Sequence, residues 1–442
     1  MKAYRAALLR FDPEAPPARS ALYDEDGLLV VEDEGEAGAD GVRRVVAAGA
    51  WQHLKDRFPG LHVEHLPKRI IAPGFVDMHL HYPQTDIIAS PAPGLLPWLE
   101  TYTFPEEGRF SSPEYCAQAA SFFMAELLRN GVTTALTFAT AHVESVDALF
   151  AAAQARHMRL VTGLCLMDRH APPEVLNQTE QSLADTEALI RKWHGKGRLG
   201  YAITPRFAPS CSDSQLKGAG ELAAKYPDVW IQSHVAENHD EIAWARRLFP
   251  KARSYLATYD DFGLMRARSV YAHCIHLDAA DRALMRSSGA AAAVCPTSNL
   301  FLGSGFFDFA AADAAPFHYG LASDVGGGTS FGPFHTMLAA YYVGRAAVAA
   351  APGGNGGKLA VSLSPQDLWW RHTAGAARAM GLEGVVGNLQ TGHEADFVVL
   401  NPQATPLLAR RLARANNLDE MLFAMIVLGD DRLIERVALA AA

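Results

Sequence analysis

Two histidines end an apolar segment of the chain. His79 and His81 close a run that begins at Ile70, and Asp77 is the one charged residue before them. Side chains of a β-strand alternate between its two faces, so residues two apart point the same way. Neutral imidazole is the commonest metal ligand among side chains, and a rigid strand holds two of them in place. The pair predicts metal chelation at the end of a strand, with a packed or solvated pair as the alternative.

Three further candidate ligands lie far away in the sequence. His234, His273 and Asp324 each close a short, mostly apolar run. Three imidazole nitrogens and one carboxylate oxygen suit zinc or iron and leave a position for water. A bound divalent ion lowers the pKa of such a water towards neutrality. We therefore predict a metal site made of His79, His81, His234 and Asp324.

Some of these polar residues are candidates for moving protons. Glu237 follows closely after His234, where a carboxylate can pass a proton to a leaving group or ring nitrogen; an acid favoured at a helix N-terminus is the alternative. Asp324 can accept the proton of the water as well as bind the metal. His273 is either a fourth histidine ligand or a residue that orients the water, and we favour the second role because four ligands are already present. The run at 199–204 has no lysine to bridge a second metal, so we expect one ion.

Strand-like runs must position these residues. Each run is short and apolar and is followed by a helical segment, from residue 70 to about residue 380. Strands are predicted at 70–76, 132–138, 160–166, 199–204, 229–234, 269–273, 290–295 and 319–323. Helices are predicted at 113–130, 181–193, 237–249, 278–288 and 364–380. The alternation predicts an α/β fold, a (β/α)8 barrel, whose strand C-terminal ends face one mouth and bring the ligands together. A doubly wound sheet, which would spread the ligands, is the alternative.

The two ends of the chain differ from this central part. Residues 1–68 contain short apolar runs between acidic and glycine turns, and 395–400 returns to a strand pattern. We predict that both ends pair in a small β-sandwich domain, so that residues 1–68 and 384–442 flank a hydrolase barrel at 69–383. A glycine-rich loop is predicted at 351–357.

Charge and cysteine content narrow the class of protein. The 442 residues include 39 Lys or Arg and 48 Asp or Glu, which gives a net charge of −9. This balance offers no basic surface for nucleic acid and no polybasic patch for a membrane. The five cysteines show no C-x-x-C spacing, and we find no signal segment or run of about 18 apolar residues. We expect a cytoplasmic protein that acts on a small molecule.

Longer motifs resemble those of the metal-dependent amidohydrolase superfamily. The segments 73–81 and 387–396 and the three later ligand candidates carry this resemblance. Finer motifs are similar to those of the guanine deaminases within it. These motifs are His81-Tyr82-Pro83-Gln84, the segment 96–106, Thr204-Pro205-Arg206-Phe207 and the segment 295–300. The likeness covers nearly the whole chain from about residue 65, although Ser323 stands where the family often has threonine.

The resemblance implies further roles for single residues. It implies zinc, one ion per subunit with Fe2+ as the alternative, on His79, His81, His234 and Asp324. It implies proton transfer by Glu237 and Asp324. It also implies a purine bound at Gln84, Arg206 and Phe207, with Glu237 and His273 beside the purine. Finally, it implies a homodimer.

The chemistry of the purine agrees with this assignment. Arg206 can only donate hydrogen bonds, and guanine presents acceptors at O6 and N7, whereas adenine presents an amine at position 6. Phe207 and Trp98 offer flat apolar surface, with ordinary core aromatics as the alternative. We therefore expect a metal-dependent aminohydrolase that deaminates guanine at C2 to xanthine and ammonia.

Two alternatives remain for the function. One is a related amidohydrolase that deaminates or dechlorinates another purine, a pterin or a triazine, because these relatives share the metal ligands. The other is a scaffold that kept the barrel and lost catalysis, which the intact ligands and Glu237 disfavour.

Overall fold

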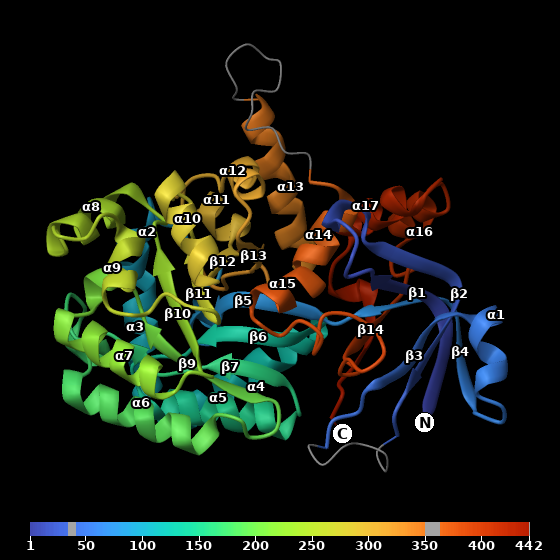
Figure 1. Ribbon diagram of the computed structural model, residues 1–442, viewed down its shortest axis with the longest axis horizontal. Coiled ribbons are helices and arrows are strands. Elements are labelled where there is room, and N and C mark those ends of the chain that lie inside the picture. Colours follow the sequence, from blue (N-terminus) through green and yellow to red (C-terminus); the bar gives the residue numbers. More distant parts are fainter. Residues whose placement is uncertain (34–40, 350–362, 442) are drawn as a thin grey trace.

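Parallel strands form a nearly closed barrel in the computed structural model, which describes residues 1–33, 41–349 and 363–441 (Figure 1). In sheet order the strands are β5 (Phe75–His81), β6 (Val132–Phe138), β7 (Arg159–Thr162), β9 (Leu199–Pro205), β10 (Trp230–Val235), β11 (Ser269–His273), β12 (Ala291–Val294) and β13 (His318–Leu321). Each pairs in parallel with the next, and β13 contacts β5 across the closure. The short β8 (Cys165–Leu166) pairs with β9. The predicted (β/α)8 barrel is confirmed.

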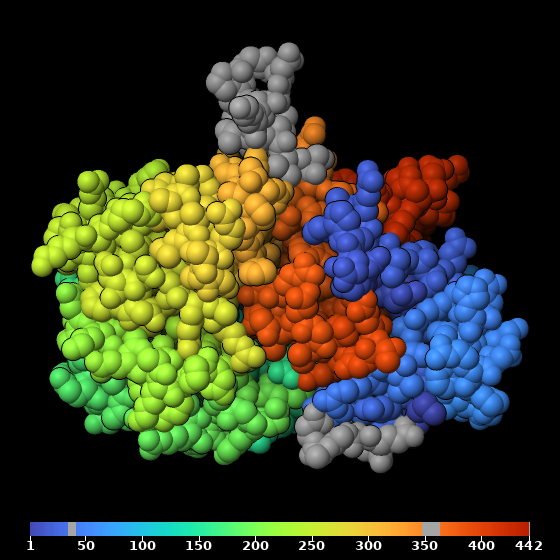
Figure 2. Space-filling view, in the orientation of Figure 1, coloured from blue at the N-terminus to red at the C-terminus, as the bar shows by residue number. Residues whose placement is uncertain are grey.

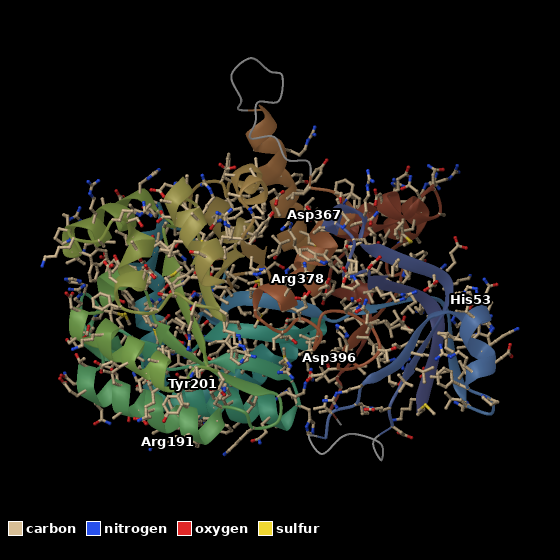
Figure 3. The ribbon with its side chains drawn as sticks, viewed as in Figure 1. His53, Arg191, Tyr201, Asp367, Arg378 and Asp396 are labelled. Carbon is tan, nitrogen blue, oxygen red and sulfur yellow. The ribbon has the colours of Figure 1, made fainter. Side chains whose placement is uncertain are left out.

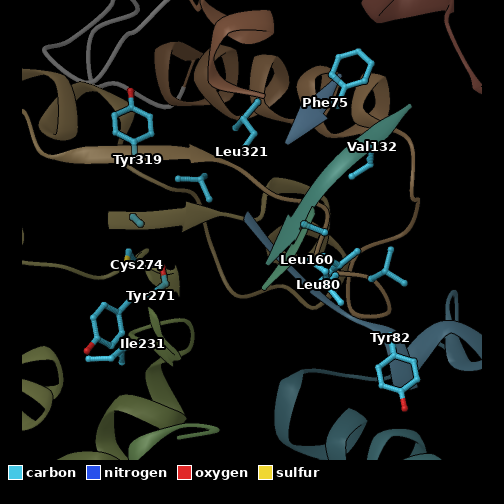
Figure 4. Close-up of a cluster of buried hydrophobic side chains, with 14 of the residues drawn as sticks. Phe75, Leu80, Tyr82, Val132, Leu160, Ile231, Tyr271, Cys274, Tyr319 and Leu321 are labelled. Carbon is cyan, nitrogen blue, oxygen red and sulfur yellow. Dashed lines mark hydrogen bonds between the residues drawn. The ribbon is translucent and has the colours of Figure 1, made fainter. Parts of the chain in front are cut away.

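Helices surround the barrel. They include α4 (Pro113–Arg129), α5 (Val143–Ala155), α6 (Thr179–Trp193), α7 (Asp213–Lys225), α8 (His239–Leu248), α9 (Tyr255–Asp261), α10 (Ala279–Ser288) and α13 (Pro333–Ala349). Polar side chains cap the first turns of several of them, as Ser112 does for α4 and Asp278 for α10. Buried side chains such as Leu80, Leu160 and Tyr271 fill the space between strands and helices (Figure 4). This packing keeps the strand ends fixed.

Strands from both chain ends form a second sheet beside the barrel. Its order is β15 (Ile434–Ala438), β14 (Phe397–Leu400), β4 (Val63–Pro73), β1 (Lys2–Phe11), β2 (Ala21–Val31) and β3 (Val45–Ala50). β14 runs antiparallel to β4, with Val398 opposite Ala72. In Figure 2 the blue N-terminal and red C-terminal residues lie together at one end of the molecule. The predicted pairing of the two ends is confirmed, and the domain boundaries at 68/69 and 383/384 stay predictions.

The predicted strand at 70–76 is wrong in its extent. Its first residues belong to β4 of the small sheet, and the barrel strand β5 begins only at Phe75. Gly74 separates the two strands. A Cβ atom at Gly74 would lie 2.1 Å from Oγ1 of Thr133, so the close approach to β6 requires glycine.

Other differences are smaller. The predicted strand at 160–166 is interrupted and forms β7 and β8. The predicted helix at 364–380 is two helices, α14 (Pro365–Arg371) and α15 (Ala374–Ala379). The C-terminal part also forms α16 (Pro406–Leu412) and α17 (Leu418–Leu428), which we did not predict. The loop predicted at 351–357 lies outside the described residues. Across the described ranges, no helix combines the length and the apolar character needed to cross a membrane.

A β-bulge in β5 aims two histidines at the mouth of the barrel. Between Asp77 and Leu80, β5 carries an extra residue relative to β6. Met78 packs with the apolar side chains inside the barrel, and Leu80 packs against the outer helices. Because a bulge redirects the side chains around it, both His79 and His81 face the functional end of the strand.

Ion pairs fasten the segment before β14 to the barrel. Arg198, directly before β9, is buried and pairs with Glu394 and Asp396. Arg159, at the start of β7, also pairs with Glu394. Figure 3 shows Asp396 where the barrel meets the small sheet. Because a buried guanidinium without a partner is costly, these pairs make the C-terminal segment part of the packing of the barrel.

Candidate active site

Three imidazoles and one carboxylate meet at the C-terminal ends of the strands. Nε2 of His81 lies 3.2 Å from Nε2 of His79 and 3.2 Å from Nε2 of His234. Oδ1 of Asp324 lies 3.2 Å from Nε2 of His79 and 3.4 Å from Nε2 of His81. The first two histidines come from β5, His234 from β10, and Asp324 follows β13. The four predicted metal ligands therefore lie around one point.

The donor atoms of this group fit a divalent cation. Burial lowers the pKa of His81 to about 4 and also lowers the pKa of His79 and of His234, which favours the neutral form of these rings. Nδ1 of His234 lies 2.6 Å from the carbonyl oxygen of Arg206 and must donate its proton there. Nε2 of His234 then presents a lone pair to the other nitrogens. Facing lone pairs and a carboxylate are a donor set for zinc or iron.

The barrel closes on itself beside these ligands. The backbone N–H of Asp324 donates to the carbonyl oxygen of His79 at 2.9 Å, and that of His81 donates to the carbonyl oxygen of Val325 at 2.6 Å. Asp77 adds its side chain to this junction and is fully buried. Burial raises the pKa of Asp77 to about 7. We predicted no role for Asp77, although a carboxyl group inside an apolar strand is a visible signal.

Glu237, which follows β10, and His273, which ends β11, face the same point. Oε2 of Glu237 lies 3.4 Å from Nε2 of His273, which lies 3.8 Å from Oδ2 of Asp324. Burial and the charge of Asp324 raise the pKa of Glu237 to about 8. A carboxyl group in this environment can hold a proton near neutral pH and release it to a neighbouring base.

Two polar residues that we did not predict orient this pair. The hydroxyl of Ser304 donates to Oε1 of Glu237 at 2.8 Å. Oδ1 of Asn299 lies 2.9 Å from Nδ1 of His273, so Nδ1 donates and Nε2 faces the site. Asn299 lies in one of the motifs noted above, whereas nothing near Ser304 distinguishes it from other loop serines. Cys295 also lies near His273, in the set of residues close enough to share an ion.

A pocket opens directly above the ligand group. All six residues predicted to contact substrate line it, together with predicted metal ligands and apolar side chains. The six are Gln84, Trp98, Arg206, Phe207, Glu237 and His273. Trp98 ends α2 (Leu95–Trp98) and donates from Nε1 to the carbonyl oxygen of Ser90 at 3.1 Å. Leu99 and Leu302 add apolar surface, so the pocket combines flat apolar walls with a few convergent polar groups.

A buried residue that we did not predict contacts the polar residues of the pocket wall. Glu107, from α3 (Phe104–Gly108), contacts both Arg206 and Gln84 with its carboxylate. It stands one position beyond the motif at 96–106. The motif therefore indicated the right segment but ended one residue before the one that contacts Gln84 and Arg206.

Comparison with known proteins agrees with this geometry. The model of the Amidohydrolase family matches residues 70–431. Guanine deaminase of Escherichia coli K12 is 40% identical over 420 residues, which cover 95% of this chain and 91% of the relative. The crystal structure of guanine deaminase from Bradyrhizobium japonicum superposes with a TM-score of 0.92 at 32% identity, covering 100% of this chain and 98% of that one.

A further solved structure is that of guanine deaminase from C. acetobutylicum with guanine bound in its active site. Its TM-score is 0.88 at 29% identity, with 100% of this chain and 99% of that chain covered. The resemblance predicted from the motifs is confirmed. This chain belongs to the amidohydrolase family, a family of metal-dependent hydrolases.

Proposed function

We propose that this chain catalyses the hydrolytic deamination of guanine to xanthine and ammonia. The observation that carries the proposal is the pocket in which Arg206 and Glu237 face the predicted metal ligands. Arg206 offers only hydrogen-bond donors, so it favours a purine whose edge carries acceptors. Glu237 offers a carboxyl group for proton transfer. The guanine deaminases that the chain resembles over nearly its whole length support the same substrate.

One zinc ion is proposed to bind at His79, His81, His234 and Asp324, with Fe2+ as the alternative metal. The neutral imidazoles and the adjacent carboxylate support this assignment. When bound, such an ion supplies a water whose lowered pKa makes it nucleophilic at neutral pH.

The chain's own residues are proposed to move the protons. The water oxygen bonds to C2 of guanine while the bond from C2 to the amine nitrogen breaks. Asp324 takes a proton from the water. Glu237 delivers the proton it holds to ring atom N3, takes up the second proton of the attacking water and delivers it to the departing amine, which leaves as ammonia. The proton on Asp324 then passes to Glu237, so that both carboxyl groups return to their starting states. His273, within 3.4 Å of Glu237, is proposed to orient the water through Nε2.

Substrate orientation is proposed to depend on the polar and aromatic walls. Arg206 and Gln84 would bind the polar edge of the purine, and Phe207 and Trp98 would cover its faces. All four side chains are almost fully buried, so an unmatched donor on the ligand would be left without a partner. Leaving a buried polar group unpaired costs about 1–3 kcal/mol, which disfavours adenine.

Ultraviolet-monitored turnover on zinc-loaded protein tests the proposal. Guanine is compared with adenine, 8-oxoguanine, pterins and triazines under the same conditions. Xanthine formation from guanine well above the other reactions is the expected result. Consumption of another heterocycle without guanine turnover would move the substrate assignment to that compound. Bound zinc without any turnover would favour a scaffold that has lost catalysis.

Three further properties of the protein stay predictions: its oligomeric state, its location in the cell and its domain boundaries. A homodimer would appear as twice the chain mass in sedimentation equilibrium. A cytoplasmic location would appear in cell fractionation. Limited proteolysis tests the domain boundaries at 68/69 and 383/384, of which the first lies inside β4.

A further inference from the structure

Glu107 links two pocket residues that are distant in the sequence. Its side chain is fully buried. Oε1 accepts a hydrogen bond from Nε2 of Gln84 at 3.1 Å, and Oε2 accepts one from a terminal guanidinium nitrogen of Arg206 at 2.5 Å. Gln84 belongs to the 3-10 turn Tyr82–Ile87, and Arg206 follows β9. One carboxylate thus holds two segments of the pocket wall.

The first consequence concerns charge. Arg206 is 3% exposed, and a guanidinium in that position needs a counter-charge. Glu107 is its ion-pair partner. Because Glu107 occupies one end of the planar guanidinium fork, it fixes the direction in which the remaining N–H groups point. Those groups lie in the wall of the pocket that contains the predicted ligands.

The second consequence concerns the amide of Gln84. An ionised carboxylate only accepts hydrogen bonds, so the NH2 group of Gln84 must face Glu107. The backbone N–H of Gly326 donates to Oε1 of Gln84 at 3.3 Å, which fixes the other end of the amide. A flipped amide would place oxygen against oxygen at one end and N–H against N–H at the other. Gln84 therefore keeps one N–H and one lone pair of known position for a ligand.

We propose that Glu107 is a positioning residue for guanine binding, because it orients Arg206 and fixes the amide of Gln84. The inference rests on the proposed function and adds a residue that itself does not touch the reacting atoms. The hydrogen bonds offered to the purine then depend on three residues. Arg206 and Gln84 make these bonds, and Glu107 determines how both side chains are oriented.

The substitution Glu107→Gln tests this role. A glutamine offers one acceptor oxygen where two donors, from Arg206 and Gln84, require one each. We expect the KM for guanine to rise about tenfold because binding groups lose their orientation, while kcat changes by less than about threefold. Zinc content and melting temperature are measured on the same samples, so that a loss of metal or fold is recognised.

Glu106→Gln is the matched control. Glu106 is the preceding residue of the same helix, and its carboxylate accepts hydrogen bonds from Arg109, at 2.9 Å, and from Tyr115. Neither partner lines the candidate pocket. The control should leave the KM for guanine unchanged, and an equal rise in both variants would overturn the specific role of Glu107.

A double-mutant cycle separates positioning from a general structural effect. In an Arg206→Ala background Glu107 keeps only its contact with Gln84, so Glu107→Gln should lower kcat/KM by less than it does in the wild-type background. Losses that simply add would overturn the proposal. If Glu107→Gln does not fold, Glu107→Asp takes its place, because it keeps the charge but is too short to reach both partners; a wild-type KM in that variant would overturn the proposal as well.

Wild-type turnover of guanine is measured before any variant. Its absence would overturn the proposed function and this inference together. Wild-type turnover with an unchanged KM in the folded Glu107 variants would overturn the role of Glu107 alone.

Discussion

Oδ1 of Asp77 accepts a hydrogen bond from the backbone N–H of Ser323 at 3.1 Å, across 246 positions of the chain. The same oxygen accepts the N–H of His79 at 3.2 Å. One buried carboxylate thus joins the first barrel strand to the segment that carries Asp324. Because these two segments supply three of the four predicted metal ligands, their relative position depends on Asp77.

Replacing Asp77 by alanine should weaken zinc binding. Neither backbone N–H would then have its acceptor, and loss of such supporting contacts lowers metal affinity about 10–100-fold. Competition with a chromophoric chelator measures the affinity, and circular dichroism checks the fold. Asp77→Asn, which keeps an acceptor oxygen, should retain more of the affinity. Wild-type affinity in the alanine variant would contradict the role.

Replacing Glu237 by glutamine should abolish most activity and leave the metal in place. The variant keeps the size of the side chain and its contact with Ser304 but cannot carry a proton. We expect kcat for guanine to fall at least about 100-fold, with the zinc content measured by atomic absorption unchanged. Full activity with zinc bound would exclude Glu237 as the proton carrier.

Replacing Arg206 by alanine should harm guanine more than other substrates. The variant loses the donors proposed for the acceptor edge and leaves Glu107 without its partner, so kcat/KM for guanine should fall about 100-fold or more. Arg206→Lys keeps the charge but not the planar fork and should recover only part of the loss. The ratio of guanine to adenine turnover is the decisive readout, and an unchanged ratio would refute the assignment.

Replacing Gly74 by alanine should destabilise the barrel. The new methyl group would lie 2.1 Å from Oγ1 of Thr133, and overpacking of this kind costs about 1–3 kcal/mol. Urea unfolding measures the change in the free energy of unfolding. Gly94→Ala is the control, because nothing lies within 4 Å of its added methyl group. Equal stability of both variants would contradict the close contact.

The sequence predicts the metal ligands of this site better than the strands and residues that hold these ligands in place. Strand alternation predicts His79 and His81 as a pair, although a bulge in β5 aims them in the structure. The later ligands are predicted from their places at the ends of apolar runs. The start of β5 could not be predicted, because residues 70–73 are as apolar as a barrel strand and only their pairing with β14 and β1 assigns them to the small sheet. The pairing with β14 joins residues hundreds of positions apart.

Glu107 shows the same limit within the site. Glu106 and Glu107 are adjacent and chemically identical, and both side chains are mostly buried. Only the fold brings Glu107 to Arg206, 99 positions away, while Glu106 turns to Arg109. Local patterns indicate which residue types are present, whereas the choice between neighbouring residues depends on contacts that local patterns do not contain.

The pairing of Arg198 with Glu394 and Asp396 limits how this protein can be divided. A chain that ended after the barrel would retain the arginine next to β9 but lose both of its carboxylates. The barrel is therefore not a detachable module that could be excised or grafted alone. Any minimal version of the enzyme must keep the C-terminal segment, because this segment neutralises a charge that the barrel itself has buried.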